Sequence, residues 1–231
     1  DGVTFPAAEI KLEFMDPGAD EGSEGGSMFP TGNLIDTLDI PGIGKIDATL
    51  INAGIPSIFV DAKSIGLTGV EMQKDANTNP ELLKKFEMIR SHATVAMGLA
   101  TSAEEVTAKR PHSPKIAFFS KPQSYASSSG KMVEASSIDV VARIVSMGKL
   151  HHAMTGTGAV AIAVASSIKG TLVANLIESG VTGEVRFGHP SGSLKVGAEA
   201  AQVNGEWTVT KAVMSRSARR LMDGQVLVTI E

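Results

Sequence analysis

Residues 155–168, Thr-Gly-Thr-Gly-Ala-Val-Ala-Ile-Ala-Val-Ala-Ser-Ser-Ile, form the stretch of this sequence that decides the fold. From Ala159 to Ile168 the side chains are small or apolar on every side of a helical turn. A helix without a polar face is a buried helix, and this one is too short to cross a membrane. The stretch therefore predicts a core helix around which the rest of the domain is built.

The start of this helix is also the strongest candidate for a binding site. The first N–H groups of a helix lack internal acceptors, and the helix dipole adds roughly half a positive charge at that end. Gly156, Thr157 and Gly158 let a ligand approach closely, so we expect their amides to donate to a carboxylate. Thr155 or Thr157 can cap the helix, and a well-capped core helix without a ligand is the alternative interpretation.

Strand-like runs surround the helix. Asn204-Gly205 predicts a tight hairpin between two of them, and the turn at residues 52–55 joins another pair. The run 138–146 is rich in Val and Ile and predicts a strand, with a helix as the alternative. The expected strands are 8–14, 44–50, 56–61, 115–119, 138–146, 184–187, 193–203, 206–214 and 225–230. We therefore predict an α+β fold in which an antiparallel, barrel-like sheet wraps around one central buried helix.

A second helix is predicted from Pro80 to about Gly98. Pro80 suits the first helical position, and Glu81 complements the positive end of the dipole. Leucine, phenylalanine and isoleucine side chains follow at helical spacing. We expect an ordinary packing helix on the outside of the sheet.

The composition limits the functions that this chain can have. Its 231 residues are 42% hydrophobic and carry a net charge of −4. Lys and Arg are scattered, so nothing resembles the basic surface of a nucleic-acid-binding protein. The absence of Cys excludes disulfides, thiolate metal sites and a cysteine acid or base within this chain. We recognise neither a signal peptide nor an apolar run of about 18 residues, and we expect a cytoplasmic protein with no membrane partner.

The first residues read as the middle of a longer chain. The sequence starts at Asp1, and residues 8–14 alternate polar and apolar side chains, which predicts a half-buried strand. Residues 16–27 are rich in Gly, Asp and Glu and predict a surface loop or a domain crossover. We therefore divide the chain into residues 1–33, a crossover strand and loop from a missing N-terminal half, and residues 34–231, a C-terminal domain.

Several motifs resemble those of known enzymes. Gly156-Thr157-Gly158-Ala159 matches the last four positions of the Cys-Gly-Thr-Gly-Ala motif of diaminopimelate epimerase-like enzymes, with Thr155 at the position of Cys. Five longer strings resemble the 2-methylaconitate cis-trans isomerase (PrpF) family: 28–33 (MFPTGN), 52–56 (NAGIP), 146–154 (SMGKLHHAM), 188–192 (GHPSG) and 214–219 (MSRSAR). These strings span nearly the whole chain. Members of the family are longer, so the resemblance covers their C-terminal portion only.

The resemblance implies a fold and a reaction. Such proteins have two similar, pseudo-symmetric halves, each a sheet closed around a central helix, with the ligand between them. The reaction removes a proton next to a carboxylate and returns one elsewhere on the allylic system, without metal, flavin or pyridoxal, so we expect no cofactor. The acid and base are a Lys and a Cys of the N-terminal half, so we assign no catalytic residue to this chain. The expected partners are a small tricarboxylate, the N-terminal half and, as an option, a second copy in a homodimer.

The resemblance also implies binding roles outside the helix. Ser146, Met147 and Gly148 occupy the position at which epimerases carry a ligand-gripping Glu-Arg-Gly motif. Ser146 would bond a carboxylate, and Met147 would supply apolar contact, with core packing as its alternative role. Asn52, in a turn that matches another epimerase loop, would hold a further carboxylate.

Three histidines and an arginine cluster complete the candidates. His152, or its neighbour His151, would attract an anion or move a proton, with a structural hydrogen bond as the alternative. Ser191, close to His189, would contact the ligand or belong to a turn at the end of a strand. The arginines are expected on a solvated face or at an oligomer contact; they are Arg216, Arg219 and Arg220.

The expected reaction is the cis-trans isomerisation of 2-methylaconitate or aconitate, in the 2-methylcitrate route of propionate catabolism. A 4-oxalomesaconate tautomerase, which performs a related proton shift, is the alternative enzyme. The alternative of another class is a non-catalytic domain that binds a carboxylate or dimerises when isolated. Thr155 in place of Cys argues against racemisation of an amino acid, because a hydroxyl is too weak an acid to move protons unaided.

Overall fold

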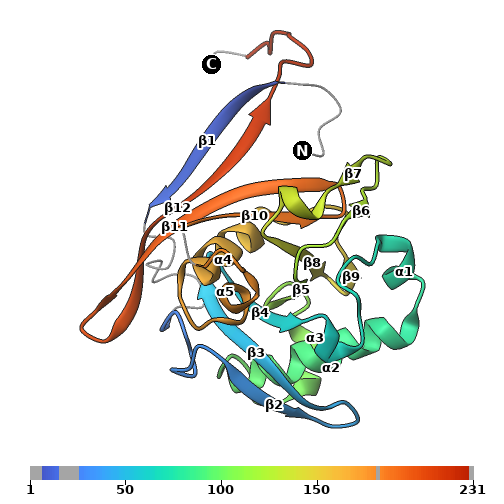
Figure 1. The fold of residues 1–231 in the computed structure, drawn as a ribbon, viewed down its shortest axis with the longest axis vertical. Helices are drawn as coiled ribbons and strands as arrows, with labels where there is room; N and C mark the ends of the chain where they lie inside the picture. Colours follow the sequence, from blue (N-terminus) through green and yellow to red (C-terminus); the bar gives the residue numbers. More distant parts are fainter. Residues whose placement is uncertain (1–6, 16–25, 181–182, 229–231) are drawn as a thin grey trace.

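A computed structural model describes residues 7–15, 26–180 and 183–228, which form one large mixed sheet with helices on both faces (Figure 1). The strand order is β1-β12-β11-β10-β8-β5-β4-β3-β2, and β9 pairs with β8. The strands of this sheet are β1 (Ala8–Met15), β2 (Asp36–Ile40), β3 (Gly44–Ala53), β4 (Ile55–Asp61), β5 (Lys115–Ser120), β8 (Val140–Ser146), β9 (Lys149–Leu150), β10 (Glu184–His189), β11 (Gly192–Val203) and β12 (Glu206–Ala218). A small second sheet pairs β6 (Tyr125–Ala126) with β7 (Met132–Val133). The helices are α1 (Gln73–Asn77), α2 (Pro80–Ala96), α3 (Ala103–Lys109), α4 (Gly156–Ser167) and α5 (Leu172–Leu176), with short 3₁₀ turns at Lys63–Ile65 and Ala135–Ser137.

Most strand pairs are antiparallel, as predicted, but two are parallel and correct that expectation. β4 pairs in parallel with β5, and β8 pairs in parallel with β10. In both cases the connection contains helices: α1 to α3 separate β4 from β5, and α4 and α5 separate β8 from β10. A helical crossover returns the chain to the same end of the sheet, which makes the next strand parallel.

The helix α4 lies in the core, as its uniformly apolar sequence predicts. Its residues from Gly158 to Ser166 are buried, and its aliphatic side chains belong to the cluster that fills this face of the sheet. α4 contacts β3 and β4 on one side and β10, β11 and β12 on the other, so the sheet curls around it (Figure 1). Each buried Val or Ile side chain contributes roughly 1.5–3 kcal/mol, which explains how a helix without a polar face is stable here.

The helix α2 covers the opposite face of the sheet and begins where the sequence predicts. Asn79 caps it by accepting a hydrogen bond from the Leu82 N–H at 3.1 Å, and Pro80 occupies the first turn. Phe86 is buried and stacks on Phe118 of β5, with ring centroids 5.5 Å apart. The prediction of an outer packing helix is therefore confirmed. None of the helices in the described ranges is long and apolar enough to cross a membrane.

Two predicted turns are confirmed, and one predicted strand is wrong. Asn204 and Gly205 join β11 to β12 with φ angles of 54° and 87°, as a tight hairpin of this kind requires. Gly54, with a φ of 70°, joins β3 to β4. The predicted strand 225–230 is absent over residues 225–228, which are irregular and exposed; residues 229 and 230 lie outside the described part. Alternating side chains form a strand only where a neighbouring strand supplies hydrogen bonds.

The strand β1 is regular, but the expectation that it is half-buried is wrong. It pairs along its whole length with β12, and all eight of its residues are exposed. Ile10, Leu12 and Phe14 form an apolar stripe that is 36–42% exposed. β1 and the end of β12 project together from the rest of the molecule (Figure 1), so the described residues place nothing over this stripe. Most of the predicted loop at 16–27 lies outside the described residues.

Candidate functional site

The start of α4 has two amides without an acceptor. Thr155 caps the helix, because its Oγ1 accepts a hydrogen bond from the Gly158 N–H at 3.2 Å. The Gly158 amide is therefore already bonded inside the chain. Of the three expected donors, the N–H groups of Gly156 and Thr157 find no acceptor in the described ranges. The structure thus narrows the predicted carboxylate site to the first two residues of the helix.

Both glycines of this turn have close neighbours. A Cβ on Gly158 would lie 2.6 Å from Cδ1 of Ile144 on β8. A Cβ on Gly156 would lie 2.9 Å from Nη2 of Arg216 on β12. The tip of the β3–β4 hairpin packs on the same turn, since a Cβ on Gly54 would lie 3.1 Å from Val160. Strands distant in sequence therefore meet at the start of α4.

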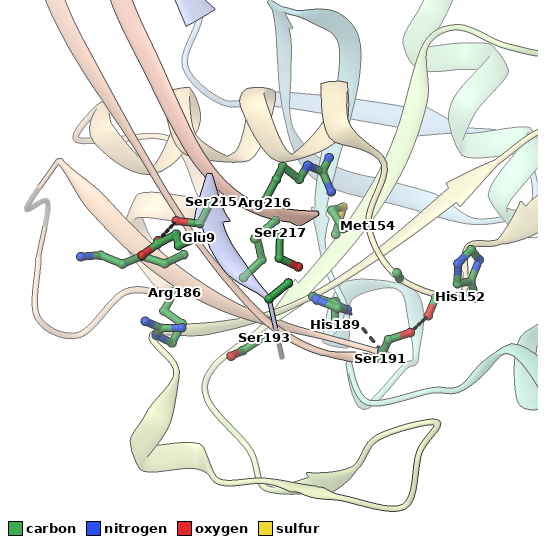
Figure 2. A pocket seen from close by; sticks show the side chains of 14 residues that line it. Glu9, His152, Met154, Arg186, His189, Ser191, Ser193, Ser215, Arg216 and Ser217 are labelled. Atoms are coloured by element: carbon green, nitrogen blue, oxygen red, sulfur yellow. Dashed lines mark hydrogen bonds between the residues drawn. The ribbon is translucent and has the colours of Figure 1, made fainter. Parts of the chain in front are cut away.

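A cleft of about 530 Å³ opens beside this helix start (Figure 2). Met154 and Arg216 line it next to the first turn, and His152, His189 and Ser191 line its other side. The lining also contains the cations Arg186, Lys195 and Arg216 and the acid Glu9. In the described ranges, no group of three or more His, Asp or Glu side chains is arranged to hold a metal ion.

Arg216 makes a contact that the sequence analysis did not predict. Its side chain is exposed, as the expectation of a solvated face requires, and so are those of Arg219 and Arg220. The Arg216 side chain also points toward the first turn of α4 (Figure 2). No acidic residue occupies that turn, and no carboxylate of the described residues pairs with Arg216. The positive end of the helix repels a guanidinium beside it, weakly here because the side chain is exposed to water, and an anion near both would turn this repulsion into attraction. The alternation Ala212, Met214, Arg216 on β12, whose first two members are buried, was the available signal.

His152 and Ser191, both predicted site residues, lie together at the cleft. The Ser191 hydroxyl donates to the His152 carbonyl oxygen (Figure 2). The ring of His151 stacks on that of His152, with centroids 4.5 Å apart, and its Nδ1 accepts a hydrogen bond from the Ala153 N–H. Burial, followed by the neighbouring His152, lowers the pKa of His151. The neutral form of His151 is thereby favoured, with the ring hydrogen on Nε2.

His189 lies at the end of β10, and Gly192 begins β11, so the expected turn at a strand end is confirmed. Its ring is buried, and its Nδ1 accepts a hydrogen bond from the Ser191 N–H at 3.2 Å. Burial lowers the pKa of His189 to about 4. A ring that stays neutral at pH 7 cannot attract an anion by charge, and its Nδ1 holds the backbone of Ser191.

The other predicted residues are not among those that line this cleft, and these include Thr155, Gly156, Thr157 and Gly158 of the helix start itself. Ser146 ends β8, and Met147 and Gly148 form the two-residue turn to β9. All three line a separate, much smaller hollow. Met147 is 61% exposed, which contradicts the alternative of core packing. Asn52 lies near the β3–β4 hairpin tip, where its N–H donates to the Met28 carbonyl oxygen at 2.8 Å. The motifs at 28–33 and 52–56 therefore meet in space.

Comparison with known proteins identifies relatives over nearly the whole chain. The family model described as PrpF protein matches residues 1–229. A 2-methyl-aconitate isomerase of Shewanella oneidensis is 60% identical over 99% of this chain and 57% of its own length. A 3-methylitaconate isomerase of Eubacterium barkeri is 35% identical over 99% of this chain and 58% of its own length. This chain thus spans somewhat more than half the length of the curated relatives that it matches.

A solved structure shows the same fold. The crystal structure of a methylitaconate-delta-isomerase is 32% identical and superposes with a TM-score of 0.80, over 95% of this chain and 56% of that one. The likeness confirms the predicted α+β, diaminopimelate epimerase-like fold.

Proposed function

The chain belongs to the PrpF protein family, and on that premise we propose that it forms part of an isomerase of small unsaturated tricarboxylic acids. The relatives named 2-methyl-aconitate isomerase are 56–60% identical, whereas an oxalomesaconate isomerase of Novosphingobium is 30% identical. This difference favours 2-methylaconitate over oxalomesaconate as the substrate. We assign the reaction to the metabolism of small carboxylic acids, because the relatives are named as isomerases of such acids.

One observation carries the proposal: Arg216 lines an open cleft, and its guanidinium reaches the position that a Cβ of Gly156 would take, next to the two unpaired amides of the helix start. Both groups donate hydrogen bonds. The guanidinium carries a full positive charge, and the helix start carries a partial positive charge. A carboxylate between them would satisfy the amides and relieve the repulsion between the guanidinium and the helix end. A tricarboxylate supplies such a group and leaves two more for the rest of the site.

The roles of this chain in the reaction follow from these contacts. Removal of a proton next to a carboxylate moves negative charge onto that carboxylate, which becomes enolate-like. Donors fixed in advance at a helix start stabilise such charge without reorganising. Thr155 serves as the helix cap, and we assign the proton-transferring Lys and Cys to the part of the relatives that this chain does not match.

The exposed apolar surfaces fit a protein of two parts. The stripe on β1 and the residues Leu221, Met222 and Leu227, which are 78–95% exposed, are unusual for a surface in water. We propose that residues 1–33 connect to a second part of the protein and that this part covers both surfaces. The domain at 34–231 then supplies one wall of the active site.

The test is the activity of the full-length protein on 2-methyl-trans-aconitate, followed by absorbance and by proton exchange in heavy water. Arg216→Gln should raise KM about 10- to 100-fold, because a charge-assisted hydrogen bond contributes about 1.5–3 kcal/mol. Lys109→Gln, which removes an exposed cation on α3 away from the cleft, is the matched control. Turnover of oxalomesaconate alone, or binding of a carboxylate without turnover, would select one of the two alternatives instead. Normal KM in Arg216→Gln would remove the helix-start site.

A further inference from the structure

The turn between β10 and β11 faces the cleft on one side and the hairpin of β6 and β7 on the other. His189 and Ser191 of this turn line the cleft. Phe187 belongs to the core cluster around α4, and alternation along β10 places His189 on the same face and Gly188 on the opposite one. A Cβ on Gly188 would lie 2.7 Å from the hydroxyl of Tyr125 on β6. Tyr125 therefore lies behind the turn, on the face of the sheet opposite α4.

The Tyr125 hydroxyl holds both ends of this turn. Its oxygen lies 2.7 Å from the His189 carbonyl oxygen and 3.0 Å from the Gly192 carbonyl oxygen. His189 and Gly192 are the last residue pair of β10 and β11, so a single hydroxyl hydrogen is shared by the two carbonyls that close the turn. Between them, the Pro190 carbonyl oxygen accepts a hydrogen bond from the Ser128 N–H at 2.8 Å. Three carbonyl groups of the turn thus bind donors of the β6–β7 hairpin.

Tyr125 is itself fixed by a buried cation. Cζ of Arg143 on β8 lies 4.7 Å from the centroid of the Tyr125 ring, and both side chains are buried. The Arg143 Nε donates to the Glu71 carbonyl oxygen at 2.7 Å, and Nη1 donates to the Ala142 carbonyl oxygen at 3.0 Å. A desolvated guanidinium is attracted to the face of an aromatic ring. The ring of Tyr125 is therefore held at its face as well as at its hydroxyl.

Ser191 connects this turn to the segment that leads into α4. Its hydroxyl donates to the His152 carbonyl oxygen (Figure 2). A hydroxyl has a single hydrogen, so in this arrangement Ser191 holds the backbone and has no hydrogen left to donate to a ligand. His152 precedes Thr155, the cap of α4, by three residues, and residues 151–155 belong to no helix or strand. The Ser191 hydrogen bond thus fixes the irregular segment from which the helix starts.

From these contacts we infer that Tyr125 is a positioning residue for the carboxylate site at the start of α4. From the opposite face of the sheet it fixes the β10–β11 turn. Ser191 of that turn then fixes the approach to the helix, so that the unpaired amides of Gly156 and Thr157 keep their direction. The inference rests on the proposed function, because it concerns the same carboxylate. It assigns a role to a residue that does not itself line the cleft.

Tyr125→Phe in the full-length protein tests the inference, because it removes the hydroxyl and keeps the ring over Arg143. The turn then loses its shared donor, so KM for 2-methyl-trans-aconitate should rise about 10-fold, while kcat changes little. A purely structural role would have the reverse effect: a less stable protein has fewer active molecules, which lowers the apparent kcat and leaves KM unchanged.

A double-mutant cycle tests whether Tyr125 acts through Ser191. Ser191→Ala should raise KM to a similar extent as Tyr125→Phe. The double variant should have a KM no higher than that of the more affected single variant, because both changes break one chain of contacts. Ser191→Thr, which keeps a hydroxyl, should recover most of the affinity.

Ser124→Ala is the matched control, because it removes a hydroxyl from the residue next to Tyr125. The Ser124 hydroxyl binds Glu134 and the Ala135 N–H, at the other end of the same hairpin, so its loss should leave KM unchanged even where the melting temperature falls. A normal KM in Tyr125→Phe, additive effects of the two changes, or an equal rise of KM in Ser124→Ala would overturn the inference. If the unmodified full-length protein does not turn over the substrate, the proposed function and this inference fail together. Normal turnover by the unmodified protein with a normal KM in Tyr125→Phe overturns this inference alone.

Discussion

Gly156 and Arg216 lie so close that a single methyl group on the glycine would come within 2.9 Å of Nη2 of the arginine. The two residues are 60 positions apart in the sequence, and β12 and α4 bring them together. This contact places a flexible cation at the positive end of a buried helix. It gives the helix start a partner that the local sequence does not reveal.

Gly156→Ala should weaken substrate binding without destabilising the protein. The new methyl would displace the Arg216 guanidinium, whereas alanine in place of glycine favours a helix by up to about 1 kcal/mol. We expect KM to rise about 10-fold while the free energy of unfolding, measured with urea, stays constant or increases. A loss of stability together with normal KM would show that the contact is only structural.

Met147→Asn should stabilise the protein and weaken ligand binding. Met147 has a φ of 53°, and Asn adopts this left-handed region at lower cost than Met, so we expect the free energy of unfolding to rise by about 1 kcal/mol. Loss of the exposed thioether should raise KM. Met132→Asn, at another exposed methionine with an ordinary φ, is the control and should not increase stability. Unchanged KM in Met147→Asn would mean that the strained turn serves no ligand.

The stability of the protein should fall as the pH is lowered from about 6.5 to about 4. His189 has a pKa of about 4 in the folded protein, against 6.5 for an exposed histidine. Above pH 6.5 the ring is neutral in both states. Between these two pH values His189 is protonated in the unfolded chain but stays neutral in the folded protein. The free energy of unfolding therefore decreases by up to about 3 kcal/mol as the pH falls and is constant below pH 4 as far as His189 is concerned.

Urea unfolding at a series of pH values measures this dependence. His189→Gln removes the titrating ring, so the part of the slope between pH 6.5 and 4 that is due to His189 should disappear in this variant. Identical slopes in both proteins would place the acid sensitivity elsewhere.

Leu12→Ser should affect a different property in each of two forms of the protein: self-association in the 231-residue chain and stability in the full-length protein. In the 231-residue chain, Leu12 is exposed on β1, and the substitution should reduce self-association, measured by light scattering. In the full-length protein, where we propose that this stripe is covered, it should lower the free energy of unfolding by about 2 kcal/mol or more. Equal stability of both full-length proteins would show that the stripe stays exposed.

Much of the fold could be predicted from local sequence. The uniformly apolar run after Thr155 predicts the buried helix, because a helix with no polar face must be surrounded by other apolar groups. Asn79-Pro80 predicts the start of α2, and Asn204-Gly205 predicts the β11–β12 turn, because each depends on backbone preferences of adjacent residues. The parallel pairing of β4 with β5 was missed, because periodicity gives no information on which strands become neighbours.

The candidate site was predicted only where local sequence carries its chemistry. The helix start follows from the glycines at 156 and 158, since unpaired amides are a property of every helix end. The contact of Arg216 with the helix start was not predicted, because an exposed cation on a strand looks the same in sequence whether or not a helix end lies beside it. The hydrogen bond that Lys115 donates to Ser146 was not anticipated at all, because it joins two strands that pair only in the folded sheet.

By itself, then, the sequence determined the helices α2 and α4, most of the long strands and two turns, which helix is buried, and that its first amides are unpaired, because these depend on neighbours within a few residues. Only the tertiary structure decided that Arg216 reaches the start of α4, that Lys115 donates a hydrogen bond to Ser146, and that the apolar side of β1 is exposed. Hydrogen bonds and charges across strands depend on register and sheet curvature, which arise from the packing of the entire chain.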